Sequence, residues 1–281
     1  MNAILVLTDF SDSSIHAARY AATLSRDLKP LKVILYHSFL PIHSLLEIPV
    51  PSPAFEESIK EKALNQLDEL KNSILDINPA LEIEVTARNE MSVDALISYI
   101  IHYPFDMVVM GATGKGALER ALIGSFTVQM IRNCTVPLLI IPPQASFRSI
   151  NTMVFACDLK NVHHTPVKSI SMLASCFHAH LHILSVSAPG DEFNTRLLSE
   201  QKTLHEMWGN PQPAYHYLND KDTATGIMKF IKDNQVDMAV VVRKHRRFFQ
   251  SLFHKSTSCE LAYHTWIPLL VLDEDRQSDS D

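Results

Sequence analysis

The sequence has few of the residues that build cross-links or strongly charged surfaces. Its four cysteines lie far apart and include no CxxC pair, which argues against a disulfide framework and against a zinc ribbon. The formal net charge is −6, whereas a general binder of nucleic acid or of anionic membranes needs a surplus of Lys and Arg. We therefore expect a reduced protein that binds neither nucleic acid nor membrane surfaces.

Long hydrophobic runs are absent as well. No apolar run approaches the roughly 20 residues that span a bilayer. No basic segment precedes the first apolar run, Ile4–Leu7, as one would in a signal peptide. The protein is therefore expected in the cytoplasm. Its apolar fraction of 46% over 281 residues is enough to form a core in each of two domains.

The chain repeats itself. Residues 4–10 (ILVLTDF) and 153–159 (MVFACDL) are matching apolar runs, which places Asp9 and Asp158 at equivalent positions. Three further pairs of strand-like runs follow in the same order: 33–38 with 182–187, 106–110 with 237–241, and 136–141 with 267–272. Four matches in one order predict two copies of one domain.

The predicted domains span residues 1–145 and 150–273, and an acidic, disordered tail follows at 274–281. In each copy, apolar runs alternate with segments of helical period. The helical segments of the first copy are Ser13–Arg26, Glu56–Asp76, Val93–His102 and Phe126–Asn133. This order predicts an α/β fold with two tandem, open, five-stranded parallel sheets that are doubly wound. Ligands of such sheets bind beyond the carboxyl ends of the strands.

Glycine is scarce in the chain and concentrated in one segment. Only seven glycines occur, and four fall between an apolar run and a short helical segment: Gly111, Gly114, Gly116 and Gly124. Glycine permits positive φ and close backbone approach, and a helix N-terminus attracts anions, so the segment predicts a phosphate-binding loop. Ser125 is expected to cap that helix and to donate to phosphate. The alternative is a loop that needs glycine only for its turns, with Lys115 and Arg120 on a solvated face.

The spacing of these glycines is specific. From Gly111 to Ser125 it reads G-x2-G-x9-G-S, which differs from the dinucleotide and Walker motifs. It resembles the ATP-binding loop of the universal stress protein family, whose domains have the same five-stranded α/β order. The resemblance covers nearly the whole chain as two tandem domains. It implies an adenine-nucleotide α-hydrolase-like fold and ATP as ligand, with or without Mg²⁺.

The resemblance also implies roles for single residues. Asp9 stands where the family places an aspartate against the adenosine end; alternatively, it caps the following helix with Ser11 or Ser13. Ser38 and Leu7 depart from the family, which usually has an apolar residue and often a proline there, so the phosphate contacts match better than the adenine contacts. The expected nucleotide-binding residues are Asp9, Ser38, Met110, Gly111, Gly114, Gly124, Ser125 and Thr127.

The second copy differs at the equivalent loop. Residues 243–256 contain no glycine and are basic and aromatic, so an ATP site of the same design is not expected there. The loop either attracts an anion or acidic partner, or is solvated with its phenylalanines packed down. Asp158 is then expected to keep its position as part of the repeated fold and to bind no ligand.

Other sequence features carry no catalytic signature. His178, His180 and His182 alternate, yet a metal site would need further ligands. No general base, nucleophile or paired carboxylates are evident. The resemblance implies an ATP-binding stress-response or signalling protein, in which nucleotide bound to the first domain modulates conformation or the binding of a protein partner. The alternatives are a slow Mg²⁺-dependent ATPase and an interaction scaffold without nucleotide.

The last apolar runs of the copies, 136–141 and 267–272, would be edge strands, which must be covered or paired. Family members commonly dimerise through this strand. The resemblance therefore implies an internal pseudo-dimer of the two copies, with a homodimer as a further arrangement.

Overall fold

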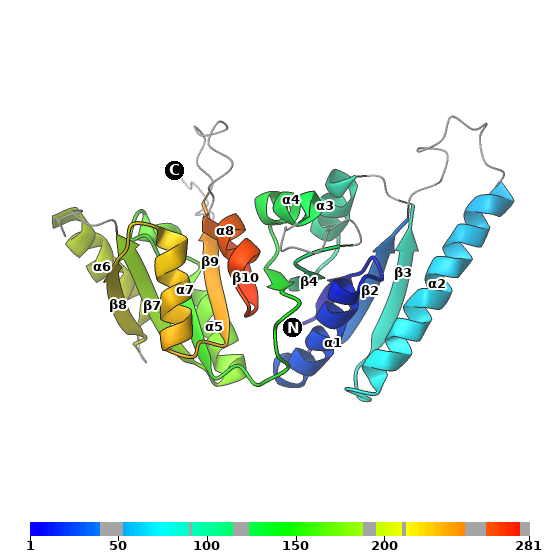
Figure 1. The fold of residues 1–281 in the computed structure, drawn as a ribbon, viewed down its shortest axis with the longest axis horizontal. Helices are drawn as coiled ribbons and strands as arrows, with labels where there is room; N and C mark the ends of the chain where they lie inside the picture. The colour runs from blue at the N-terminus through cyan, green and yellow to red at the C-terminus, as the bar shows by residue number, and fades with distance from the viewer. Residues whose placement is uncertain are drawn as a thin grey trace. The chain divides into compact units, whose positions relative to one another are not determined.

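The structure is a computed structural model that describes residues 1–39, 53–89, 92–114, 124–187, 195–209, 212–244 and 257–275. The chain divides into two compact units, Met1–Phe147 and Arg148–Asp281 (Figure 1). Within the described residues each unit has five parallel strands and is an α/β domain, so the predicted fold class is confirmed. No helix in this part of the chain has the length and apolar character needed to cross a bilayer.

The first unit orders its strands β3-β2-β1-β4-β5. These strands are β1 (Ala3–Leu7), β2 (Lys32–Ser38), β3 (Ile83–Arg88), β4 (Met107–Gly111) and β5 (Leu138–Ile141). In register, Leu5 of β1 lies between Ile34 of β2 and Val108 of β4. All three side chains are buried, as expected for a parallel sheet covered on both faces. The chain order reverses between β1 and β4, which makes this pair the switch point where doubly wound sheets bind ligands.

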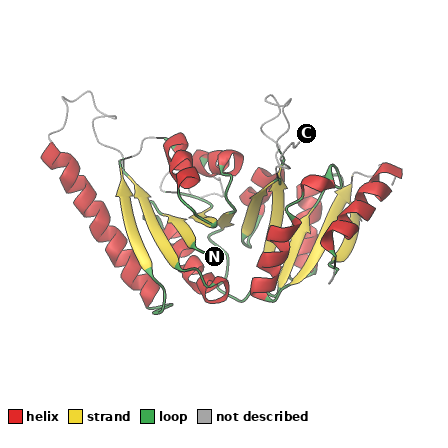
Figure 2. Ribbon diagram, turned by 180° about the vertical axis from the view of Figure 1, so that it is seen from behind, coloured by secondary structure: helices red, strands yellow, loops and turns green. Residues whose placement is uncertain are grey.

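The helices of the first unit are α1 (Asp12–Leu28), α2 (Pro53–Leu75), α3 (Val93–His102) and α4 (Ser125–Asn133). Helix α1 packs against α2, and α3 packs against α4. Figure 2 shows the strands as a layer with helices on both of its sides. Helix α1 begins at a side-chain cap, because the Ser11 hydroxyl accepts from the Ser14 N–H, and it ends at Lys29 in the left-handed conformation.

The second unit repeats this plan in the order β8-β7-β6-β9-β10. Its strands are β6 (Thr152–Ala156), β7 (His180–Ser187), β8 (Ala214–Asn219), β9 (Met238–Arg243) and β10 (Leu269–Asp273). Its helices are α5 (Val167–Phe177), α6 (Thr195–Trp208), α7 (Thr223–Asp233) and α8 (Thr257–His264), with a short 3₁₀ turn, η2 (Val162–His164), before α5. The two units thus have the same arrangement of strands.

The repeat extends to single hydrogen bonds at the amino ends of the sheets. Asp106, which precedes β4, accepts from the backbone N–H groups of Asn2 and Ala3 at the start of β1. Asp237, which precedes β9, accepts in the same way at the start of β6, at 2.9 and 3.0 Å. Each carboxylate therefore joins the two central strands of its sheet.

Several strand boundaries differ from those expected. Strand β1 ends at Leu7, before Phe10, whose φ of 61° leaves the extended region. Strands β5 and β10 begin after Pro137 and Pro268, because proline has no N–H to donate to the ladder. Residues 276–281 of the expected tail lie outside the described residues.

Candidate functional site

The turn after β1 fixes the position of Asp9. Phe10 adopts a left-handed φ of 61°, an uncommon conformation for a bulky residue. Asp9 Oδ1 then accepts from the Ser11 N–H at 3.0 Å and from the Ser11 hydroxyl. Ser11 in turn caps α1 through Ser14. Asp9 therefore supports the cap through Ser11, and its carboxylate is held at the carboxyl end of β1.

Two residues absent from the sequence-based set complete this turn. The Thr8 hydroxyl accepts from the Phe10 N–H at 3.0 Å. His37, on β2, donates from Nδ1 to the Thr8 carbonyl at 2.8 Å, and its ring centroid lies 4.4 Å from that of Phe10. The imidazole is thus the tautomer protonated at Nδ1, because a carbonyl oxygen only accepts. The one sign of this role in the sequence was that His37 directly precedes Ser38, an expected nucleotide-binding residue.

Two glycines of the cluster are required by close approach. A Cβ at Gly111 would lie 2.6 Å from Ser13 Oγ and 2.8 Å from the Ser13 carbonyl oxygen, so glycine lets α1 pack directly on the end of β4. A Cβ at Gly114 would lie 2.8 Å from Asp9 Oδ2. The Asp9 carboxylate therefore faces the start of the glycine segment, across the β1–β4 switch point.

The start of α4 differs in detail from the expectation. Gly124, with φ −63° and ψ 150°, is the N-cap residue, and Ser125 is the exposed first residue of the helix. Ser125 is therefore not the cap, because the extended residue before a helix fills that position. Among the described residues, which do not include 115–123, no atom lies within 4 Å of a Cβ built on Gly124. Thr127 is buried and donates to the Ala112 carbonyl at 3.2 Å, which ties α4 to the end of β4.

The expectation of positive φ at these glycines was wrong. Among the described glycines only Gly209, outside the cluster, has a positive φ. Close packing explains Gly111 and Gly114 instead. Gly116, Lys115 and Arg120 lie outside the described residues.

The other expected residues lie at the carboxyl ends of neighbouring strands. Ser38 ends β2 and is exposed, whereas Met110 in β4 is buried, with 4% of its surface exposed. Because β2, β1 and β4 are adjacent, the structure brings Ser38, Asp9 and Gly111 to one edge of the sheet.

Ser13 has an unusual environment. Its side chain is 8% exposed, and within the described residues its buried hydroxyl has no hydrogen-bond partner. Its neighbour Ser14 shares a hydrogen bond of 3.0 Å with the Thr8 hydroxyl. A buried hydroxyl without a partner costs stability, and here it accompanies the tight contact with Gly111.

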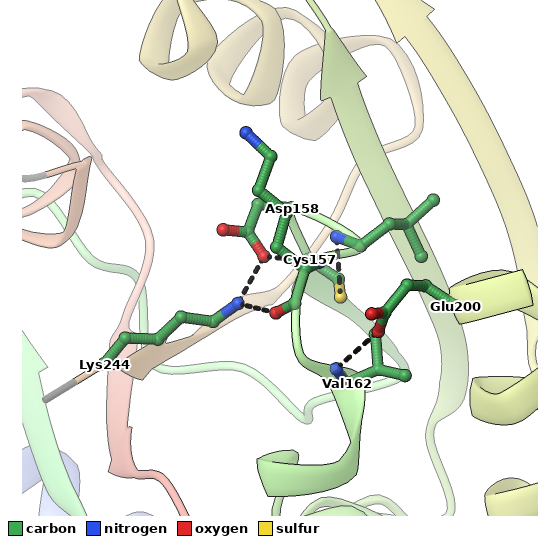
Figure 3. Close-up of polar contacts among 7 residues, drawn as sticks. Cys157, Asp158, Val162, Glu200 and Lys244 are labelled. Atoms are coloured by element: carbon green, nitrogen blue, oxygen red, sulfur yellow. Dashed lines mark hydrogen bonds and ion pairs between the residues drawn. The ribbon is translucent and has the colours of Figure 1, made fainter. Parts of the chain in front are cut away.

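In the second unit, a lysine contacts Asp158, the residue equivalent to Asp9. Asp158 Oδ1 accepts from the Lys160 N–H at 3.1 Å and forms an ion pair with the Lys244 ammonium (Figure 3). The same ammonium donates to the Lys160 carbonyl. Lys244 aligns with Thr113 of the first unit, and Val242 aligns with Gly111. The rest of the basic loop, 245–256, lies outside the described residues.

The turn beneath this ion pair matches that of the first unit. Leu159, like Phe10, is left-handed, with φ 49°. Cys157 replaces Thr8, and its sulfur accepts from the Leu159 N–H at 3.5 Å. Burial raises the pKa of the Cys157 thiol to about 11, which keeps it protonated and unreactive at neutral pH. Glu200 accepts from the Val162 N–H at 2.9 Å and so caps η2 (Figure 3).

The alternating histidines separate in the structure. His178 is the left-handed residue that ends α5, so it does not share the strand face of the other two. His182 Nδ1 lies 2.8 Å from His216 Nε2 on β8. Burial lowers the pKa of His182, and the charges of His216 and His180 lower it further. The described residues contain no group of three or more His, Cys, Asp or Glu able to hold a metal ion.

Comparison with known proteins agrees with this geometry. The model of the universal stress protein family matches residues 1–142, about half of the chain. The chain belongs to the universal stress protein family. A universal stress protein of Methanocaldococcus jannaschii is 24% identical over 140 residues, which cover 49% of this chain and 80% of the relative. One from Thermus aquaticus is 22% identical over 132 residues, covering 46% of this chain and 93% of the relative.

The tandem arrangement also has a solved counterpart. The crystal structure of a universal stress protein from Archaeoglobus fulgidus superposes with a TM-score of 0.75 at 17% identity. The match covers 97% of this chain and 98% of that chain. The structural likeness thus extends over both units.

Proposed function

We propose that the first unit binds ATP at the carboxyl ends of β2, β1 and β4, and that binding modulates conformation or the choice of a protein partner. The protein would then be a nucleotide-responsive member of a stress-protein family. The observation that carries this proposal is the Asp9 carboxylate, which is held at the carboxyl end of β1 with Oδ2 toward Gly114, the start of the glycine segment.

The phosphates would lie at the N-terminus of α4. The backbone N–H groups of Gly124 and Ser125 begin this nine-residue helix, and the helix dipole favours an anion there. Gly124 has no side chain of its own, and no other described residue comes within 4 Å of a Cβ built there, so these residues leave the backbone accessible to phosphate oxygens. Gly111 and Gly114 contribute to the site indirectly. Without side chains at these positions, α1 can pack on the end of β4 and Asp9 can lie close to Gly114.

Asp9 would contact the adenosine end. Its Oδ1 is engaged by Ser11, which leaves the rotamer fixed with Oδ2 toward Gly114. A carboxylate oxygen in that position can accept from a ribose hydroxyl or from the adenine amine. Ser38, exposed at the end of β2, is placed to contact the base from the neighbouring strand.

The second unit would bind no nucleotide of the same kind. The Lys244 ammonium already neutralises Asp158. Val242 occupies the position of Gly111, the glycine that lets α1 pack on β4 in the first unit. Any ATP site there would have to displace this ion pair and order flexible cationic side chains, each at about 2 kcal/mol of rotamer entropy.

A calorimetric titration of the intact chain with ATP and Mg²⁺ tests the proposal. Gly124→Val places a branched side chain at the start of α4, and losing one or two charge-assisted hydrogen bonds should weaken ATP binding at least about tenfold. Gly124 has an extended backbone with negative φ, so valine fits locally and the variant should fold. If the folded variant binds ATP with unchanged affinity, the helix terminus is not part of the site.

A further inference from the structure

The second unit has a hollow at the amino ends of its strands, the edge opposite to the Asp158–Lys244 pair. Its volume is about 560 Å³, and it is lined by Arg148, Ile231, Lys232, Gln235, Val236 and Trp266. These residues come from the segment before β6, the end of α7, the α7–β9 connection and the α8–β10 connection. The volume falls in the usual range of small-molecule sites.

The charge of this hollow is positive. Asp237 is 7% exposed and is fully engaged, because one oxygen accepts from two backbone N–H groups and the other pairs with Arg148 Nε at 2.9 Å. That pair uses one of the five N–H donors of the guanidinium and fixes its position. Lys232 adds a second, exposed cation at the end of α7. An anion entering the hollow therefore meets a net charge of one positive unit, from Lys232, together with the guanidinium N–H donors of Arg148 that Asp237 does not use.

An aromatic ring lines the same hollow. Trp266 is 40% exposed, which is a large exposed apolar surface for one side chain. In the backbone around it, the buried Thr265 hydroxyl accepts from the Ile267 N–H at 3.3 Å. An exposed indole offers a flat stacking surface to an aromatic ligand.

The first unit does not carry this set of residues. Where the second unit has Lys232, Val236 and Trp266, the first has Ile101, Phe105 and Thr135. Phe105 packs instead in an aromatic cluster, with ring centroids 5.6 Å from Tyr99 and 6.1 Å from Tyr103. The cations and the exposed indole are thus specific to the second unit, and the repeated framework does not require them.

We propose that this hollow binds a small organic anion that carries an aromatic ring, of the aromatic carboxylate class. The carboxylate would contact Arg148 and Lys232, and the ring would stack on Trp266. The site is independent of the nucleotide site, because the residues that line it belong to the second unit and lie at the amino edge of its sheet.

The two tryptophans of the chain, Trp208 and Trp266, make the test direct. The full-length protein labelled with ¹⁵N gives one indole N–H signal for each. Titration with phenylacetate should move the Trp266 signal saturably and leave that of Trp208, on α6, in place. Acetate and 2-phenylethanol, which supply only the charge or only the ring, should bind at least about fivefold more weakly.

A matched pair of variants tests the charge. Lys232→Gln should weaken phenylacetate binding about threefold, whereas Lys229→Gln, an exposed lysine on the same helix outside the hollow, should leave it unchanged. The proposal is overturned if phenylacetate produces no saturable movement of the Trp266 signal or if 2-phenylethanol binds equally well. Equal effects of the two lysine variants would also overturn it.

Discussion

The two units have the same hydrogen bonds between their central strands at the amino ends of the sheets, but different residues at the carboxyl ends. Asp106 and Asp237 make these shared hydrogen bonds. At the carboxyl ends, the first unit has Gly111 and Gly114, whereas the second has Val242 and the Lys244–Asp158 pair. The contacts that hold strands together are thus retained in both copies, while the edge where such sheets bind ligands has diverged.

The largest expected difference between the units is in nucleotide binding. Asp9→Ala removes an acceptor for the adenosine end and should weaken ATP binding at least about tenfold, while Asp158→Ala should leave it unchanged. Calorimetry on the intact chain should give one ATP per chain. A stoichiometry of two, or a similar loss in both variants, would contradict the assignment.

A second experiment introduces the second unit's residue into the first. Gly111→Val places a branched side chain where even a Cβ would lie 2.6 Å from Ser13 Oγ and 2.8 Å from its carbonyl oxygen. Overpacking against backbone should lower the free energy of unfolding by about 1–3 kcal/mol, measured by urea denaturation. Gly124→Ser is the control, because it adds a preferred N-cap residue where no described atom lies close to the Cβ, and it should not destabilise. Equal stability of Gly111→Val and the unmodified protein would show that α1 can move away freely.

The paired serines of α1 allow a finer comparison. Ser13→Ala removes a buried hydroxyl without a described partner and should raise the free energy of unfolding by about 1 kcal/mol. Ser14→Ala removes a hydroxyl that bonds to Thr8 and to the Ser11 carbonyl, so it should lower it by a similar amount. Thermal melting of both variants measures the two signs, and a loss on Ser13→Ala would show that its hydroxyl has a partner.

The smallest expected effect is a pH dependence of the two outer strands of the second unit, β7 and β8. By strand register, His182 and His216 lie where the first unit has Ile34 and Thr86. The pKa of His182 is lowered below 6.5 by burial, so the unfolded chain takes up its proton at a higher pH than the folded one. The stability that neutral His182 contributes is therefore complete above pH 6.5 and is lost as the pH falls through its lowered pKa.

Hydrogen exchange resolved by residue should show this loss in β7 and β8 and not in β2 and β3. His182→Ile, which places the residue of the first unit at this position, should flatten the dependence. Equal acid sensitivity of β2–β3 and β7–β8 would assign the effect to other groups.

Much of the fold could be predicted because parallel strands buried on both faces are nearly continuous apolar runs. The repeat, the strand order and helix Val93–His102 followed from that pattern, since apolar spacing is a local property of the chain. The positions of Asp9, Ser38 and Gly111 at adjacent strand ends followed from the order of the elements.

The contacts between distant residues could not be predicted in this way. Nothing local indicates that Lys244 reaches Asp158, or that His37 donates to the Thr8 carbonyl. The conformation of single residues was equally hidden: Gly124 and not Ser125 caps α4, and left-handed φ occurs at Phe10 instead of at the clustered glycines. Such details depend on how a strand and a helix meet in three dimensions.

The left-handed residue after β1 and β6 has a consequence for how duplicated domains evolve. Phe10 and Leu159 both keep an unfavourable conformation, which costs on the order of 1–3 kcal/mol, although the edges around them have diverged. The cost thus belongs to the turn that follows the first strand of each unit and not to any one ligand. Both copies keep this turn although the paths from it to the next α-helix differ in length. The differences between the two units then lie in side chains, which can be replaced one at a time.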